Sequence, residues 1–164
     1  MRGEPPRAQH FLRPEIARRL VAHAGVGPDD LVLDLGAGTG ALTLPLAARA
    51  ARVVAVERDA RLARRLARRV PANVSVHERD IADVWLPRRP FRVVANLPFA
   101  GSNAVVRRLL ARGVPLLGAD LVVELGVALK WCGSTPARCS LATVLPPGAF
   151  VPPPRCRAAV LRIR

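Results

Sequence analysis

Short apolar runs alternate with helical patterns along the chain from residue 31 onward. Such alternation predicts an α/β fold with a doubly wound parallel sheet and crossover helices. Segments 140–146 and 157–163 have no convincing helix between them, and we expect them to form a terminal hairpin. The other expected strands are 31–35, 53–56, 74–76, 91–95 and 121–123, and the expected helices between them are 41–50, 60–69 and 102–112.

The beginning of the chain differs from this pattern. Residues 1–13 are interpreted as a basic, proline-containing arm, and Pro14 suits the first position of a helix through His23 that ends at Gly25. No apolar run approaches the roughly 20 residues of a membrane helix, and the first residues lack the apolar core of a signal peptide. The 164 residues fit one domain. We therefore expect a single domain, 1–164, that stays in the cytoplasm and does not contact a membrane.

The net charge of +14 limits the class of partner. Such a field attracts polyanions and speeds encounter with nucleic acid. Lys130 is the only lysine among the 26 basic residues, so a genome biased toward arginine offers a second explanation. The three cysteines, Cys132, Cys139 and Cys156, form no Cys-x-x-Cys pair. We expect neither a metal site nor a disulfide, with all three thiols structural.

A glycine-rich loop follows the first long strand and opens a helix. It contains Gly36, Gly38 and Gly40, and glycine lets the backbone turn sharply and approach a ligand closely. Glu57 ends the next strand, where its carboxylate could accept hydrogen bonds from two ribose hydroxyls. A plain tight turn would explain the loop alone, but the loop and the acid together predict a nucleoside cofactor.

The spacing of the loop favours S-adenosylmethionine over a dinucleotide. Dinucleotide enzymes need Gly-x-Gly-x-x-Gly, with a helix N-terminus facing the pyrophosphate, and this loop has another spacing. Asp34 opens the loop, and its negative charge would repel phosphate but suit a cationic methionine moiety. Asp80, after the third strand, is placed to accept a hydrogen bond from an adenine amino group.

The segment Asn96-Leu97-Pro98-Phe99 ends the fourth expected strand. An exocyclic amine of adenine is a poor nucleophile because its lone pair is delocalised into the ring. Asn96 and a backbone carbonyl of the Leu97–Pro98 stretch could accept its two hydrogens, and Phe99 offers a face for the purine. Such a transfer needs positioning rather than a base or a metal. An ordinary strand-ending turn is the alternative, which the loop, Glu57 and Asp80 disfavour.

These motifs together resemble the rRNA adenine N6-methyltransferases, which include the erythromycin-resistance (Erm) enzymes and the small-subunit dimethyladenosine transferases. Residues 9–12, Gln-His-Phe-Leu, are similar to the family's Gln-Asn-Phe-Leu, and residues 140–142 and 150–154 are similar to its last strands. The resemblance implies a Rossmann-like class I methyltransferase fold, a seven-stranded, mostly parallel sheet with an antiparallel last strand. It also implies that Asn96 and Phe99 hold the adenine, and that the cofactor site comprises His10, Leu12, Asp34, Gly36, Gly38, Glu57, Arg58, Asp80, Ile81 and Asn96.

The implied reaction is methyl transfer from S-adenosylmethionine to adenine N6 of ribosomal RNA. The expected substrate is 23S rRNA, before or during ribosome assembly, where the modification would confer resistance to macrolide-type antibiotics. A monomer is expected. Two alternatives stay open, namely a small-molecule methyltransferase of the same fold and a non-catalytic RNA-binding relative. A small-molecule enzyme would need neither the Asn-Leu-Pro-Phe segment nor the charge.

The chain departs from the family pattern in three places. His10 replaces an asparagine, Glu124 and Gly126 stand where the family has Gln and Glu, and the chain ends after its last strand without the family's helical C-terminal lobe. We expect arginines to compensate for that lobe by binding RNA phosphates. The arginines expected near the site are Arg2, Arg7, Arg13, Arg107, Arg108 and Arg112, whereas those between 61 and 69 are expected to form a solvated face.

Overall fold

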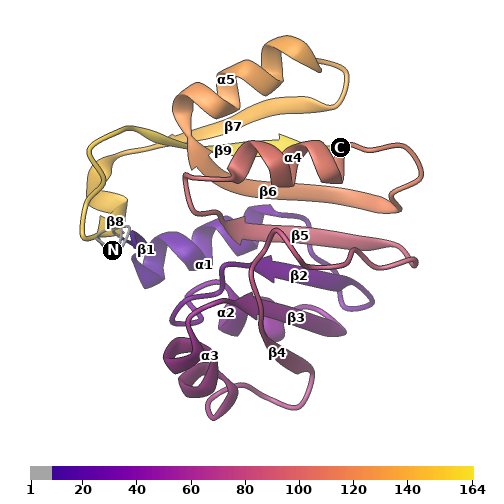
Figure 1. The fold of residues 1–164 in the computed structure, drawn as a ribbon, viewed down its shortest axis with the longest axis vertical. Helices are drawn as coiled ribbons and strands as arrows, with labels where there is room; N and C mark the ends of the chain where they lie inside the picture. The colour runs from indigo at the N-terminus through magenta and orange to yellow at the C-terminus, as the bar shows by residue number, and fades with distance from the viewer. Residues whose placement is uncertain (1–8) are drawn as a thin grey trace, which may run out of the picture.

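The computed structural model describes residues 9–164. Its centre is a seven-stranded sheet in the order β4-β3-β2-β5-β6-β9-β7 (Figure 1). All pairs are parallel except those of β9, which runs antiparallel to β6 and β7. The strands of this sheet are β2 (Leu31–Leu35), β3 (Arg52–Glu57), β4 (Val74–Glu78), β5 (Phe91–Asn96), β6 (Leu116–Glu124), β7 (Cys139–Leu145) and β9 (Ala158–Ile163). The predicted α/β fold is confirmed, including the antiparallel last strand and the terminal hairpin.

Helices cover both faces of the sheet because its central strands are apolar on both sides. On one face, α1 (Pro14–His23) and α2 (Thr43–Ala47) pack on alternate residues of the strands, such as Val32 and Val94. On the other face, α4 (Ser102–Leu109) and α5 (Leu125–Ser134) pack on the intervening residues. The helix α3 (Ala60–Ala67) buries Leu66 near Ala55 of β3. Two apolar layers therefore hold the central sheet rigidly.

Boundaries of the predicted elements agree at α1 and β2 and differ elsewhere. The helix α1 has Pro14 in its first turn, and Gly25 follows its end with a positive φ. The helix α2 is only five residues long, and β6 extends over nine residues. The additional residues of β6 pair with both β5 and β9, so neighbouring strands determine its length more than its own sequence does.

Two elements were missed by the sequence analysis. The helix α5 contains Gly126 and Gly133, which disfavour a helix, but it buries Ala128 and packs Trp131 against the core. The second is a small sheet in which β1 (Phe11–Leu12) pairs antiparallel with β8 (Phe150–Val151), next to a 3-10 turn (Pro147–Ala149). Both elements are stabilised by tertiary contacts that no local pattern reveals.

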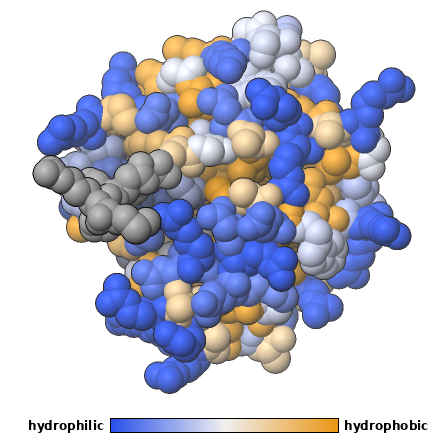
Figure 2. Space-filling model, viewed as in Figure 1, coloured by the Kyte–Doolittle hydropathy of each residue, from blue (hydrophilic) through white to orange (hydrophobic). Residues whose placement is uncertain are grey.

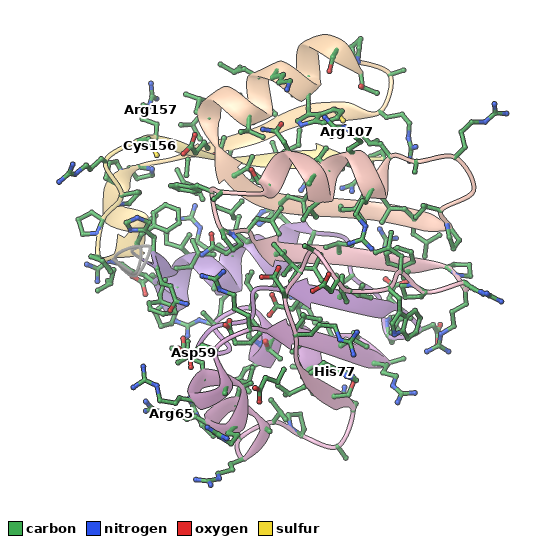
Figure 3. The ribbon with its side chains drawn as sticks, in the orientation of Figure 1. Asp59, Arg65, His77, Arg107, Cys156 and Arg157 are labelled. Atoms are coloured by element: carbon green, nitrogen blue, oxygen red, sulfur yellow. The ribbon has the colours of Figure 1, made fainter. Side chains whose placement is uncertain are left out.

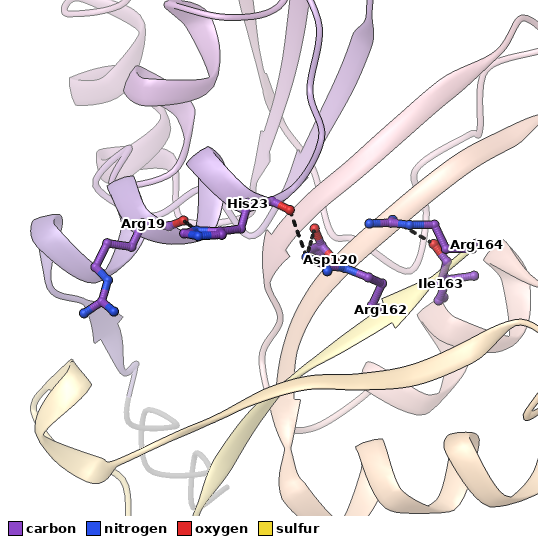
Figure 4. Close-up of polar contacts among 6 residues, drawn as sticks. All are labelled: Arg19, His23, Asp120, Arg162, Ile163 and Arg164. Carbon is purple, nitrogen blue, oxygen red and sulfur yellow. Dashed lines mark hydrogen bonds and ion pairs between the residues drawn. The ribbon is translucent and has the colours of Figure 1, made fainter.

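Arg162 of β9 forms an ion pair with β6 and a hydrogen bond with the end of α1 (Figure 4). Arg162 Nε donates to Asp120 Oδ1 at 2.7 Å, and the same guanidinium donates to the His23 carbonyl at 2.9 Å. Asp120 is almost fully buried, so breaking this pair would leave an uncompensated charge. The contact joins β6, β9 and the end of α1 into one scaffold.

In residues 9–164, no helix has both the length and the apolar character that crossing a bilayer requires. The three cysteines are free thiols. Arg2 and Arg7 of the predicted arm lie outside the described residues.

Candidate active site

A cavity of about 690 Å³ opens at the carboxyl ends of the parallel strands. It lies where the strand order reverses between β2 and β5, which is the usual position of ligands in open α/β sheets. Its volume lies within the range of about 300–1,000 Å³ typical of small-molecule and cofactor sites. Eleven predicted site residues line it, namely His10, Gly36, Gly38, Glu57, Arg58, Asp80, Ile81, Asn96, Leu97, Pro98 and Phe99.

The glycine loop follows β2 and forms one wall of the cavity. The amides of Gly36 and Ala37 donate to the Val56 carbonyl at 2.8 and 2.9 Å, which fixes the loop on the end of β3. Gly38 has a φ of +54°, and a Cβ there would lie 3.0 Å from the Phe11 ring. A larger residue would therefore strain the backbone and displace β1 from the cavity wall.

Glu57 ends β3 and holds the loop in place. Its Oε2 accepts from the Gly38 amide and its Oε1 from the Asp59 amide, both at 2.8 Å. The side chain is only 4% exposed. Glu57 therefore has a structural role in addition to the predicted one at the cofactor site, because it satisfies two backbone donors. Its oxygens retain lone pairs toward the cavity, so a ligand hydroxyl can still donate to them.

Asp80 and Arg58 form the opposite rim. Asp80 Oδ1 accepts from the Ala82 amide at 2.9 Å, and Asp80 Oδ2 lies 3.8 Å from an Arg58 nitrogen. Both side chains are about half exposed, so water screens this ion pair. The amide bond orients the carboxylate, and the weak ion pair leaves it accessible to a ligand amino group.

Asp34 and Leu12 do not line this cavity. Both border a separate space of about 20 Å³ beneath the loop, and both are buried. Asp34 Oδ2 accepts from the Thr43 hydroxyl at 2.6 Å, and its Oδ1 has no hydrogen-bond partner within residues 9–164. Burial, with a smaller effect of the Glu57 charge, raises the pKa of Asp34 to about 7 despite the Thr43 bond. The structure thus places Asp34 behind the loop, where it supports the loop and is separated from the cavity.

Asn96 is the last residue of β5, and its side-chain amide has a fixed orientation. Its Nδ2 donates to the His10 carbonyl at 2.8 Å. This contact uses one N–H of the amide and leaves Oδ1 able to accept a hydrogen bond, and Asn96 lines the cavity. Leu97 is buried, and its amide donates to the Val122 carbonyl of β6 at 3.1 Å. The burial of Leu97 in the core therefore fixes the Asn96–Phe99 motif and places Asn96 at the cavity.

Phe99 lies against His10 at the mouth. The two rings are stacked, with centroids 5.8 Å apart and an interplanar angle of 28°. His10 Nδ1 lies 2.8 Å from the Pro152 carbonyl, and the Ser102 hydroxyl donates to the Phe99 carbonyl at 3.1 Å. The small β1–β8 sheet thus brings His10, in the position of the family's asparagine, onto the Asn96–Phe99 motif.

Arg108 of α4, which was expected near the site, lines the cavity but has another role than the one predicted. Its guanidinium donates to the carbonyls of Ile81, Ala82 and Val84. Arg108 was expected to bind RNA phosphate, but these three bonds commit it to holding the connection after β4. No local sequence signal distinguishes it from its neighbour Arg107, which is exposed on the α4 side of the molecule (Figure 3). The lining residues that were missed from the sequence are Gln9, Phe11, Ala82, Ala100, Gly101, Ala104 and Val105.

Comparison with known proteins establishes the family. A family model described as ribosomal RNA adenine dimethylase matches residues 6–164. The chain belongs to the ribosomal RNA adenine dimethylase family. The resemblance inferred from the glycine loop, Glu57, Asp80 and Asn96–Phe99 is thereby confirmed.

Relatives within the family differ in the ribosomal RNA that their names specify. A probable ribosomal RNA small subunit methyltransferase A of Pyrobaculum aerophilum is 35% identical over 95% of this chain and 72% of its own length. An rRNA adenine N-6-methyltransferase of Bacillus licheniformis is 35% identical over 79% of this chain and 47% of its own length. The structure of the 23S rRNA methyltransferase ErmE superposes with a TM-score of 0.85 and 29% identity, over 94% of this chain and 69% of ErmE. This member of the family therefore spans between about half and three quarters of these relatives.

Proposed function

We propose that this chain methylates N6 of an adenine in ribosomal RNA, with S-adenosylmethionine as the methyl donor. The observation that carries the proposal is the Asn96 side chain, which lines the cavity and whose amide is held in place by a hydrogen bond to the His10 carbonyl. A hydrogen-bond acceptor fixed beside an aromatic ring suits an amino-substituted base. The family and the basic charge support an RNA substrate.

The residues of the cavity fit the proposed cofactor. A Cβ on Gly36 would lie 3.5 Å from the Asn96 carbonyl oxygen and from the Pro98 ring, so glycine keeps this narrow part open. Glu57 and Asp80 place carboxylate acceptors on the loop side and the opposite rim, where hydroxyl and amino groups of a nucleoside would donate. With these two carboxylates, the proposed cofactor site offers hydrogen-bond acceptors. A dinucleotide would instead need donors that bind its phosphates.

The protein's own contribution is to position the amine. S-adenosylmethionine, when bound, supplies an electrophilic methyl group on a sulfonium. Asn96 Oδ1 and a carbonyl of the Leu97–Pro98 stretch would accept the two hydrogens of the adenine amine, which localises its lone pair. Phe99 would support the purine ring by stacking. Binding the base in this geometry lowers the entropic part of the barrier. The new N–C bond would replace the methyl–sulfur bond of the donor, which leaves as S-adenosylhomocysteine, and the amine would release a proton to solvent.

We further propose 23S rRNA as the substrate, with macrolide-type resistance as the consequence. The superposition on ErmE, a 23S rRNA methyltransferase, with a TM-score of 0.85 supports this assignment. The similarity to small-subunit enzymes makes 16S rRNA the competing substrate. The two differ in which purified RNA accepts the methyl group, so the question can be decided in vitro.

The test uses the whole chain with labelled S-adenosylmethionine and separately purified 16S and 23S rRNA. The RNA is digested and the labelled nucleoside is identified by mass spectrometry. We expect N6-methylated adenosine from 23S rRNA. Label in another nucleoside, or in small molecules of a cell extract but in neither RNA, would contradict the proposal. Label in 16S rRNA alone would overturn only the 23S assignment.

A further inference from the structure

Trp85 is the most exposed large hydrophobic side chain among the described residues, with 71% of its surface accessible. It lies in the connection between β4 and β5, which carries no regular helix. Isolated exposed apolar residues are common, but an exposed indole is a large surface to leave in water. A role for Trp85 requires that the chain holds its side chain in this exposed position.

The backbone around Trp85 is anchored on both sides. Val84 is buried in the same apolar layer as α4, and Leu86 packs against that layer. The Val84 carbonyl also accepts a hydrogen bond from Arg108. Because Val84 and Leu86 both face the core, Trp85 between them faces outward. Its exposure thus follows from the anchoring of its two neighbours.

The surroundings of Trp85 favour a polyanion. Arg88 and Arg89 follow it in the same connection, and Arg107 lies on α4, whose neighbour Arg108 holds that connection. All three are exposed, and none has an ion-pair partner among the described residues. Asp83 is the only acidic residue from 81 to 90. In Figure 2, hydrophilic residues are interspersed with hydrophobic ones over the side of the molecule shown.

The connection also leads directly to the catalytic cavity. Its first residues, Asp80, Ile81 and Ala82, line that cavity, and Trp85 follows three residues later. From the cavity the connection crosses the α4 side of the sheet to the start of β5, so an RNA strand that delivers an adenine to Asn96 could extend along it past Trp85. Single-stranded RNA is commonly held by aromatic side chains that stack on bases and by arginines that contact phosphates.

We propose that Trp85 is a stacking platform for an unpaired base of the RNA substrate, outside the cavity, with Arg88 and Arg89 contacting the adjacent phosphates. The inference rests on the proposed function for its choice of RNA. A partner protein is the competing occupant, but the arginines beside the indole match a polyanion better than a protein surface. Stacking would give affinity without sequence specificity.

The first test uses the fluorescence of Trp85 itself. The chain has two tryptophans and no tyrosine, so a Trp131→Phe variant reports on Trp85 alone. Trp131 donates to Asn103 Oδ1 on α4, and circular dichroism checks that the variant remains folded. We expect single-stranded rRNA fragments to quench Trp85 strongly, and heparin, a polyanion without bases, to quench it little. Equal quenching by both, or none by RNA, would overturn the proposal.

The second test measures RNA binding directly. Trp85→Ala is expected to raise the RNA dissociation constant about 5- to 100-fold, as for one lost base stack, whereas Trp85→Phe retains most of the affinity. Leu129→Ala, at another exposed apolar residue, is the matched control. Because stacking releases no counterions, Trp85→Ala leaves the salt slope unchanged, while Arg88→Gln with Arg89→Gln flattens it.

Binding is measured without methyl transfer, so this proposal and the proposed function can fail separately. RNA binding that is unaffected in Trp85→Ala would overturn the stacking role, whatever the chain methylates. Normal stacking by a wild-type chain that methylates no RNA would overturn the proposed function alone. Absence of RNA binding by the wild type would overturn both.

Discussion

Replacing Glu57 by Ala is expected to destabilise the fold even in the absence of any ligand. The carboxylate accepts hydrogen bonds from the amides of Gly38 and Asp59 and is almost completely buried. A hydrogen bond to a charged group contributes roughly 1.5–3 kcal/mol, and a buried donor left without a partner incurs its desolvation penalty. The Gly38 amide is buried, whereas the Asp59 amide lies in a partly buried contact that water can replace more easily.

Together these effects predict a loss of about 3–5 kcal/mol in the free energy of unfolding. For a domain of this size, that corresponds to roughly 6–20 °C in Tm. Urea denaturation and calorimetry, both without cofactor, measure the two quantities. Glu78 provides the control because it pairs with Glu57 in the adjacent strand, but its side chain is exposed. Glu78→Ala is expected to change stability by less than about 0.5 kcal/mol. Equal stability of the two variants would refute the proposed structural role of Glu57.

Three further predictions follow from buried or charged groups. The pKa of Asp34, about 7 in the fold against an ordinary 3.8, means that the folded protein retains a proton that the unfolded chain releases between those values. The free energy of unfolding therefore falls as pH rises through that window, by about 4 kcal/mol in total. Urea denaturation of the wild type and of Asp34→Asn at several pH values measures this loss, which is expected to disappear in the variant. Gly40→Ala is expected to lower Tm measurably, because Gly40 has a φ of +90° and a Cβ there would lie 2.5 Å from Leu66; an unchanged Tm would contradict this. Replacing Arg107 and Arg112 by Gln is expected to weaken RNA binding. It should also reduce the slope of log binding constant against log salt concentration by roughly 0.7 per lost phosphate contact. The same change at Arg61 and Arg64 is expected to have little effect, and equal effects in a salt titration would show that the predicted RNA path is wrong.

The sequence predicts the sheet well because its signal is local. Each central strand is a short apolar run that neighbouring strands and helices bury on both faces, and Pro14 and Gly25 mark the limits of α1. The helix α5 could not be predicted in this way, since its glycines disfavour a helix and its stability comes from packing on the sheet. Propensity yields to tertiary contacts in such segments.

The site is predictable to a similar extent. Residues at the ends of β2, β3 and β5 were identifiable because parallel strands bring their carboxyl ends to one edge of a sheet. The roles of individual atoms were not. Glu57 bonds the loop amides, Asp34 lies behind the loop, and Arg108 holds the connection that carries Trp85. These roles depend on which atoms meet in three dimensions, and residue type and spacing do not specify that.

The most direct test of the account is the turnover of Asn96→Ala on rRNA at saturating S-adenosylmethionine. The fixed Asn96 acceptor is the central claim, and removing it is expected to reduce kcat by about 10²–10³, as for loss of one preorganised hydrogen-bonding group in the transition state. Cofactor affinity, measured by calorimetry, is expected to change much less. Asn103→Ala, which removes a side-chain amide bonded to Trp131 away from the motif, controls for general destabilisation and is expected to keep near wild-type turnover. An Asn96→Ala enzyme that retains more than about half of the wild-type kcat would contradict the account.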